Sequence, residues 1–191
     1  MGERPLISVC VITYNHERYI LDCLEGITSQ DYPNIELIIS NDASSDHTDA
    51  KITSFIEKFK QSVTIKVKYF NHSKNLGICP NLKFALDQCT GEFIALCEGD
   101  DYWVSRDKLL RQFKSIANTR YSAVFHDVHY KKNRKINESF FNDLAGVDSR
   151  ALKNSTLKDI LTFEWLVPTC SFFFKRNCLE LPDFYEELKF G

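Results

Sequence analysis

The stretch Leu6-Ile7-Ser8-Val9-Cys10-Val11-Ile12 lies near the start of the 191-residue chain and is apolar almost throughout. A short run of this kind is typical of a strand that is covered on both faces, as in a parallel sheet. Similar apolar runs follow at residues 35–39 and 93–97, and residues 63–70 alternate between apolar and polar side chains. Each of these runs predicts a further strand.

Apolar residues at helical spacing separate the strands. The resulting order of strand, helix, strand, helix predicts an α/β fold, with a mostly parallel sheet and helices that cross over in the right-handed sense. The predicted helices cover residues 17–30, 48–59, 81–88 and 107–118. Later in the chain we expect a strand at 121–129, an irregular polar stretch at 131–154, a helix at 157–163 and a short strand at 171–174.

Composition narrows the range of functions. Lys and Arg total 24 against 26 Asp and Glu, which gives a net charge of −2. Nucleic-acid binders are usually basic, so no nucleic-acid partner is predicted. The seven cysteines include no C-x-x-C pair and are odd in number, which argues against a zinc site or a disulfide framework and favours buried thiols in a reducing compartment. The sequence shows neither a signal peptide nor an apolar run long enough to span a bilayer, so we expect a cytoplasmic location.

Polar clusters follow several of the predicted strands. They are Thr13-Tyr14-Asn15, the run at residues 41–46, and Glu98-Gly99-Asp100-Asp101. Ligands of open α/β sheets bind beyond the carboxyl ends of the strands, so the fold is expected to bring these clusters together at one edge.

The acidic cluster carries the strongest chemical signal. Glu98, Asp100 and Asp101 lie within four residues, and their mutual repulsion needs compensation. Carboxylate oxygens are the ligands that Mg²⁺ or Mn²⁺ take together with phosphate oxygens, and Gly99 permits a tight turn between the acids. A metal held there could neutralise a diphosphate leaving group. The alternative is an ordinary acidic turn before the helix that Asp107 would cap.

The other clusters are less specific. Asp42 could accept a hydrogen bond from a ribose or a base, or could belong to a turn that caps the next helix through Asp46. Tyr14 could stack on a base or pack half-buried against the fold. Asn75 and Gly77 could line an approach for phosphate, although Asn-x-Gly loops are common turns.

The other residue types give little indication of a function. No glycine-rich dinucleotide or Walker-type loop is present, which argues against dehydrogenases and P-loop enzymes. No serine or cysteine nucleophile is indicated, and the scattered histidines are expected to be surface or strand residues rather than ligands. His126 and Asp127, which are adjacent near the end of a predicted strand, are the only such pair of interest.

In this order, the motifs resemble those of the family 2 glycosyltransferases of the GT-A fold, many of which act in bacterial envelope polysaccharide synthesis. The resemblance covers residues 6 to 118 and rests on the strand ending in Thr13-Tyr14-Asn15, the run at 36–46, Asn75-Leu76-Gly77 and the run at 91–103. It implies a Rossmann-like, three-layer α/β/α fold. The sequence departs from the family at Asn41 and Glu98, which replace aspartates, and at Ala43, which replaces a glycine.

The resemblance also implies roles for the individual residues. Asp100 would hold the metal, Mn²⁺ or Mg²⁺, on the donor diphosphate, and Glu98 and Asp101 would support it or contact the ribose and sugar. The donor would be a nucleoside-diphosphate sugar, most simply UDP-linked, and the acceptor a saccharide or a lipid-linked saccharide. Peripheral association with the inner face of a membrane would follow from such an acceptor. The nucleotide site would comprise Thr13, Tyr14, Asn15, Asp42, Asn75, Gly77 and Asp101.

The acceptor side is predicted less completely. We expect a single domain over 1–191, with residues 1–118 binding the donor and 119–191 beginning the acceptor half. Family 2 enzymes generally invert the anomeric centre by using a carboxylate base. That base is expected beyond Gly191, and Asp183, Glu186 and Glu187 are weaker candidates. The alternatives are a domain that binds nucleotide sugar without transfer, and a nucleotidyltransferase, which would need a basic glycine-rich loop that residues 13–18 lack.

Overall fold

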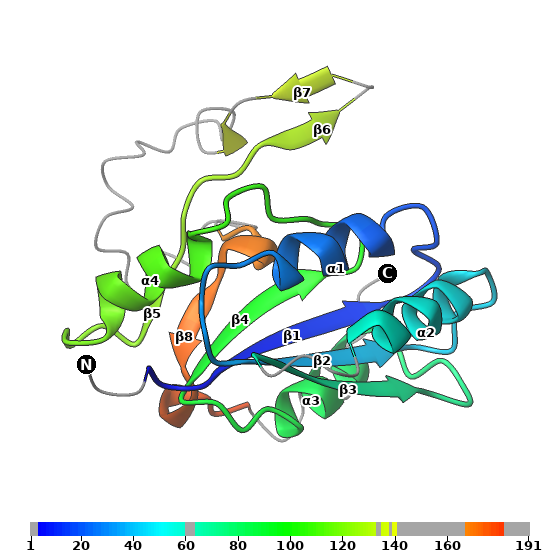
Figure 1. Cartoon of the computed structure of the whole chain (residues 1–191), viewed down its shortest axis with the longest axis horizontal. Helices are drawn as coiled ribbons and strands as arrows, with labels where there is room; N and C mark the ends of the chain where they lie inside the picture. Colours follow the sequence, from blue (N-terminus) through cyan, green and yellow to red (C-terminus); the bar gives the residue numbers. More distant parts are fainter. Residues whose placement is uncertain (1–3, 60–63, 133–134, 138, 141–166, 182–191) are drawn as a thin grey trace.

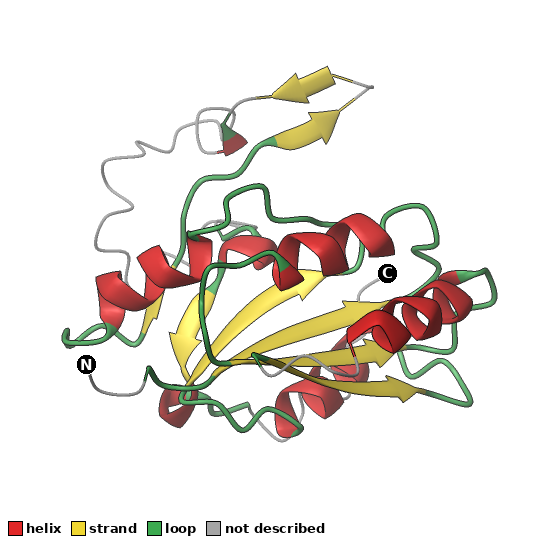
Figure 2. Ribbon diagram, viewed as in Figure 1, coloured by secondary structure: helices red, strands yellow, loops and turns green. Residues whose placement is uncertain are grey.

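A computed structural model describes residues 4–59, 64–132, 135–137, 139–140 and 167–181 of the chain. The described residues form a six-stranded sheet in the order β3-β2-β1-β4-β8-β5 (Figures 1 and 2). The first four strands along the chain are parallel, whereas β8 is antiparallel to both of its neighbours. The strands are β1 (Ile7–Thr13), β2 (Ile35–Asn41), β3 (Ile65–Asn71), β4 (Phe93–Glu98), β5 (Ala123–Val124) and β8 (Phe173–Lys175).

Among the described residues, four α-helices cover the two faces of this sheet, and together with it they form three layers (Figure 1). α1 (Ile20–Thr28), α2 (Thr48–Phe59) and α4 (Lys108–Ile116) share one core with the sheet, while α3 (Ile78–Asp87) packs on the opposite face. β2 is buried along its whole length, and β1 is buried except at one position. Burial on both faces is why these strands are nearly continuous apolar runs. The predicted α/β fold with a mostly parallel sheet is therefore confirmed.

The observed helices differ from the predicted ones mainly at their ends. α1 begins at Ile20 rather than at residue 17, because residues 16–19 form a turn in which the amide of Ile20 donates to the carbonyl of His16. α3 begins at Ile78, directly after Gly77, and so includes residues that were expected in a loop. Asp46 accepts a hydrogen bond from the amide of Thr48, as expected of a residue that caps α2.

The later part of the chain departs further from the prediction. The strand predicted over 121–129 is wrong for most of its length, because β5 contains only Ala123 and Val124. Among the described strands it pairs only with β8, which is three residues long and begins at Phe173 after a 3-10 turn, η2 (Thr169–Ser171). A second 3-10 turn, η3 (Arg176–Cys178), follows β8.

The stretch at 131–154 is not irregular throughout. β6 (Tyr130–Lys132) and β7 (Lys135–Asn137) form a separate antiparallel pair. The helix predicted at 157–163 lies outside the described residues. In the part of the chain that the structure covers, no helix is long and apolar enough to cross a membrane.

Candidate functional site

The carboxyl ends of β1, β2 and β4 lie side by side. Thr13 is in register with Asn41, and Ile12 is in register with Glu98. Hydrogen bonds extend these contacts into the loops. The amide of Asp42 donates to the carbonyl of Thr13 over 2.9 Å, and the amide of Gly99 donates to the carbonyl of Ile12 over 2.9 Å. The three polar clusters are thus adjacent, as expected of the loops at this edge of an α/β sheet.

Asn15 links the first cluster to the second. Its backbone has a φ of 56°, in the left-handed region that asparagine tolerates better than most residues. Its amide donates to Ser44 Oγ over 2.9 Å, and its side-chain oxygen accepts from the amide of Ser45 over 2.8 Å. Through these contacts Asn15 holds the two loops together. The ring of the neighbouring Tyr14 is exposed at this edge.

Asp42 is buried and organises the loop before α3. Its Oδ1 accepts from the amide of Leu76 over 2.6 Å, its Oδ2 accepts from the amide of Gly77 over 3.0 Å, and its backbone carbonyl accepts from the side chain of Asn75 over 3.2 Å. Gly77 has a φ of 90°, which L side chains rarely adopt. Asp42, Asn75 and Gly77 therefore form one unit, in which backbone amides already bind both oxygens of the carboxylate.

Ala43 follows Asp42 with a φ of 57°. The left-handed region costs a residue with a Cβ roughly 1–2 kcal/mol relative to the right-handed one. A glycine would adopt this conformation without that cost, so the turn places an alanine where a glycine would be less strained.

The acidic cluster lies against Thr13 and His16. Gly99 is packed so closely that an added Cβ would come within 2.4 Å of Thr13 Oγ1 and 2.8 Å of His16 Nδ1. Thr13 Oγ1 and His16 Nδ1 share a hydrogen bond of 3.2 Å, and His16 Nε2 is 3.9 Å from Asp100 Oδ2. His16 was expected to be a surface or strand residue rather than a ligand, and its contacts with this cluster were not predicted. Its position directly after Thr13-Tyr14-Asn15 was the available signal.

The acidic side chains differ in exposure and in electrostatics. The side chain of Asp100 is 49% exposed, whereas Glu98 and Asp101 are partly buried. Burial, followed by the charges of Asp101 and Asp100, raises the pKa of Glu98 to about 7. Burial and the charge of Asp100 also raise the pKa of Asp101. The protein itself therefore leaves the repulsion in this cluster largely uncompensated.

These carboxylates fit a divalent cation that is shared with a phosphate ligand. Their oxygens are hard donors of the kind that Mg²⁺ and Mn²⁺ bind, and a cation would offset their repulsion. Among the described residues no three side chains from His, Cys, Asp and Glu converge on a point that could hold a metal ion. Phosphate oxygens and water would complete the coordination of an ion held by Asp100 and Glu98, as is usual for Mg²⁺ sites.

The raised pKa of Glu98 predicts how stability depends on pH when no metal is bound. The folded state holds this proton up to about pH 7 and the unfolded state up to about pH 4.5, so the stabilising contribution is present below pH 4.5 and lost as the pH rises through 7. We expect the loss to reach up to about 3 kcal/mol, because each tenfold difference in proton affinity between the two states corresponds to about 1.4 kcal/mol.

Urea unfolding in EDTA at about pH 5 and about pH 8 measures this loss, with Glu98→Gln as the comparison. Glutamine does not titrate, so the variant should lose less stability than the wild type across this range. Parallel pH profiles for the two proteins would contradict the prediction.

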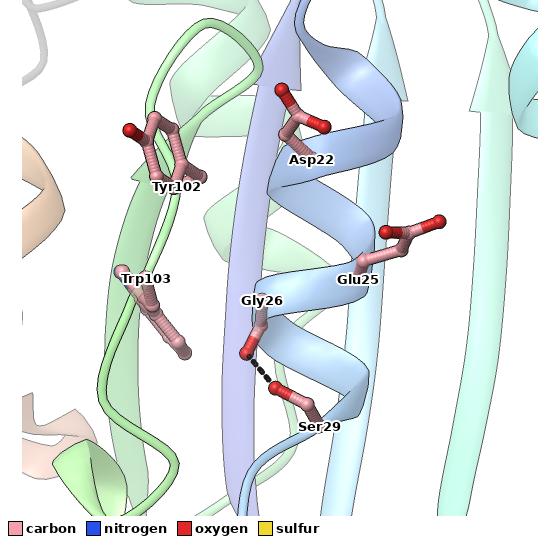
Figure 3. Close-up of a pocket in the computed structure, with 6 residues that line it drawn as sticks. All are labelled: Asp22, Glu25, Gly26, Ser29, Tyr102 and Trp103. Atoms are coloured by element: carbon pink, nitrogen blue, oxygen red, sulfur yellow. Dashed lines mark hydrogen bonds between the residues drawn. The ribbon is translucent and has the colours of Figure 1, made fainter.

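A surface groove of about 520 Å³ lies against α1 (Figure 3). It runs between α1 and the segment after β4, where Gly26 packs so tightly that an added Cβ would meet the carbonyl oxygen of Trp103 at 2.7 Å. None of the residues predicted for the nucleotide or the metal lines this groove. Its lining residues are Asp22, Glu25, Gly26, Ser29, Tyr102 and Trp103.

The remaining predicted residues add little to the description of the site. Asp183, Glu186 and Glu187, the weaker candidates for a base, lie outside the described residues. His126 follows β5 rather than ending a long strand, and its Nδ1 lies 2.7 Å from the carbonyl of Asp127.

Comparison with known proteins matches most of this chain to one protein family. Residues 8–178 match the family described as "Glycosyl transferase family 2". A GalNAc(5)-diNAcBac-PP-undecaprenol β-1,3-glucosyltransferase of Campylobacter jejuni is 30% identical over 184 residues, which cover 96% of this chain and 56% of that protein. An uncharacterized protein of Mycobacterium tuberculosis is 34% identical over 157 residues, which cover 78% of this chain and 44% of that protein. The chain thus spans about half the length of these relatives.

Solved structures with a similar fold also match this chain. Staphylococcus aureus TarS 1–349 in complex with UDP superimposes with a TM-score of 0.66 at 26% identity, over 96% of this chain and 51% of that one. The mannosyltransferase PcManGT of Pyrobaculum calidifontis, in complex with GDP-Man and Mn²⁺, gives a TM-score of 0.59 at 28% identity, over 68% of this chain and 36% of that one.

Proposed function

The chain belongs to glycosyl transferase family 2 and has its GT-A fold, and we propose that it binds a nucleoside-diphosphate sugar, most simply a UDP-sugar, and transfers the sugar to an acceptor hydroxyl with inversion. The observation that carries this proposal is the uncompensated acidic cluster at the carboxyl edge, next to the loops after β1 and β2. A phosphate-bound cation is the partner that such a cluster needs.

We assign the donor to this edge residue by residue. The exposed ring of Tyr14, beside Thr13, offers a face on which a base can stack. Asp42 acts mainly by holding Asn75 and Gly77 in place, since backbone amides bind both of its carboxylate oxygens.

On the other side of the proposed donor site, Asp100 and Glu98 hold a divalent cation, Mn²⁺ or Mg²⁺, on the diphosphate. Asp101 contacts the ribose or the sugar. The cation supplies charge neutralisation for the leaving diphosphate, which the carboxylates alone would repel.

The division of the chain and the nature of the acceptor are also part of the proposal. Residues 1–118 bind the donor, and residues 119–191 contribute to the acceptor side. The acceptor is a saccharide or a lipid-linked saccharide, by analogy with the Campylobacter jejuni relative, whose name describes an undecaprenol-linked glycan. Such an acceptor would bring the protein to the inner face of a membrane. All seven cysteines are free thiols, which suits a reducing compartment.

The test is calorimetric titration with UDP, GDP and dTDP, with and without Mn²⁺. We expect one nucleotide to bind in a Mn²⁺-dependent manner, and Asp100→Ala to weaken that binding by at least about tenfold, because a metal ligand is lost. Asp87→Asn, an exposed acid at the end of α3, is the matched control and should bind like the wild type. Folded protein that binds none of the three, or Asp100→Ala protein that binds normally, would overturn the proposal.

A donor-hydrolysis assay on the same samples separates an enzyme from a binding domain. Nucleotide binding together with slow release of free sugar supports transfer chemistry. Binding with neither hydrolysis nor transfer supports the alternative of a nucleotide-sugar-binding domain.

A further inference from the structure

Lys108, the first residue of α4, is buried although it carries an ammonium group. It is 6% exposed, and its Nζ lies 3.9 Å from the centroid of the Trp103 ring. Nζ also donates to Gln112 Oε1 over 2.7 Å. Within the described part of the chain no carboxylate pairs with it, and burial lowers its pKa to about 8. Burying an ammonium costs free energy, and the cation–π contact and the hydrogen bond offset that cost only in part.

Both partners of Lys108 bind the same short turn. Gln112 Nε2 donates to the carbonyl of Ser171 over 2.7 Å, and Trp103 Nε1 donates to the carbonyl of Cys170 over 3.1 Å. These carbonyls belong to η2, the 3-10 turn that leads into β8. A single buried cation therefore orients the two side chains that hold η2 in place.

The η2 turn lies beside the end of β4 that leads into the acidic cluster, because the amide of Leu96 donates to the carbonyl of Phe172, the residue after η2, over 3.1 Å. Burial, together with the negative charge of the nearby Asp101, raises the pKa of the Cys170 thiol in this turn to about 12. These neighbours form a ring: Trp103, Lys108 and Gln112 hold η2, and η2 lies beside Asp101, which is two residues before Trp103. The loops that carry Thr13 and Asp42 take no part in this ring.

We propose that Lys108 is a positioning residue that, through Trp103 and Gln112, holds η2 against Asp101 and so sets where the Asp101 carboxylate meets the sugar of the donor. This inference rests on the proposed function, since it presumes that a nucleotide sugar binds at this edge. The base and the diphosphate are assigned to residues outside the ring, and of the two contacts proposed for Asp101, the ribose and the sugar, this inference takes the sugar. Lys108 should therefore affect the affinity for the sugar and leave the affinity for the nucleotide nearly unchanged.

Calorimetry with Mn²⁺ tests this separation. The probes are the nucleoside diphosphate that the wild type binds and its glucose, N-acetylglucosamine and mannose conjugates. In Lys108→Met, which keeps most of the length of the side chain without its charge, we expect the Kd of the diphosphate to change by less than about threefold. The extra affinity that the preferred sugar contributes in the wild type should fall by about tenfold, as for the loss of one well-placed hydrogen bond.

Three further variants sharpen the result. Lys114→Met, an exposed lysine on the same helix, should behave as the wild type. Lys108→Arg, which can still place a cation over the Trp103 ring, should restore part of the sugar affinity. Gln112→Leu cuts the contact with Ser171 and should reproduce the effect of Lys108→Met, which keeps the test available if Lys108→Met does not fold.

The outcomes separate this inference from the proposed function. Wild-type protein that binds no nucleotide refutes the proposed function, and this inference with it. Nucleotide binding with an unchanged contribution from the sugar in both Lys108→Met and Gln112→Leu overturns the inference alone. Equal losses for the diphosphate and its conjugates would mean a purely structural role and would also overturn it, as would a wild type whose affinity gains nothing from any sugar.

Discussion

Replacing Glu36 with alanine is expected to lower the free energy of unfolding by about 4 kcal/mol. A loss of this size is typical when one partner of a buried charged network is removed. Glu36 is 2% exposed at the amino end of β2, the edge opposite the proposed donor site. Its carboxylate accepts hydrogen bonds from Ser8 Oγ, from the amides of Thr90 and Gly91, and from Lys68 Nζ. Alanine would remove the acceptor that these donors share, and a buried donor that is left without an acceptor costs about 1–3 kcal/mol.

Urea unfolding monitored by circular dichroism measures this loss, with Glu25→Ala, an exposed glutamate on α1, as the control. A difference of less than about 1 kcal/mol between the two variants would contradict the prediction, because surface substitutions themselves stay within about 0.5 kcal/mol.

The Glu36 carboxylate also makes the stability of the protein depend on pH in the acid range. Burial by itself would raise the pKa of Glu36, but the hydrogen bonds from Ser8, Thr90 and Lys68 outweigh it and lower the pKa below its ordinary value of 4.5. Its contribution to stability is therefore present above pH 4.5 and lost as the pH falls through the lowered pKa. Glu36→Gln should be less stable than the wild type at neutral pH, and the difference should shrink in acid.

Asp42→Asn is expected to weaken nucleotide binding by at least about thirtyfold and to destabilise the protein by about 2 kcal/mol. Asparagine has nearly the same shape as aspartate, but it offers one side-chain acceptor oxygen where the amides of Leu76 and Gly77 need two. One of these amides would face an NH₂ group, so the Asn75–Gly77 loop would move away from the edge at which we place the nucleotide.

Calorimetry with the nucleotide that the wild type binds, together with thermal unfolding, tests both effects. Hydrogen exchange at the Gly77 amide reports directly on the loop, and the amide should lose protection in the variant. Asp87→Asn makes the same chemical change at an exposed position and should leave affinity, unfolding and exchange unaltered. Normal affinity in Asp42→Asn would show that this loop is not part of the nucleotide site.

The predicted strands were most accurate where burial acts on both faces of the sheet. β1, β2 and β4 fall within a residue or two of the predicted runs because a parallel sheet flanked by helices demands apolar residues at nearly every position. The prediction for 121–129 was wrong because alternating apolar residues need a partner strand, and β8 offers only three residues. The length of β5 is thus set by a segment some fifty residues further along the chain.

The candidate site also has features that the local sequence predicts and features that depend on contacts between distant segments. Its three clusters could be predicted because each directly follows a strand, and parallel strands end at a common edge. His16 was missed because its 3.9 Å approach to Asp100 depends on how the loops after β1 and β4 pack around Gly99. Nothing local in the sequence indicates that Trp103 and Gln112 bind η2, since these contacts join segments about sixty residues apart.

By itself, therefore, the sequence determined the α/β fold, the edge of the sheet at which chemistry can occur, and the acidic loop at that edge. All three follow from periodicity and from the order of residues along a strand and its following loop, which are local properties. Only the tertiary structure decided that Asp42 binds the amides of Leu76 and Gly77, that His16 approaches Asp100, and that Trp103 and Gln112 bind the carbonyls of η2. Each of these depends on packing between segments distant in the chain, because the direction in which a side chain finds its partner is set by the elements that surround it.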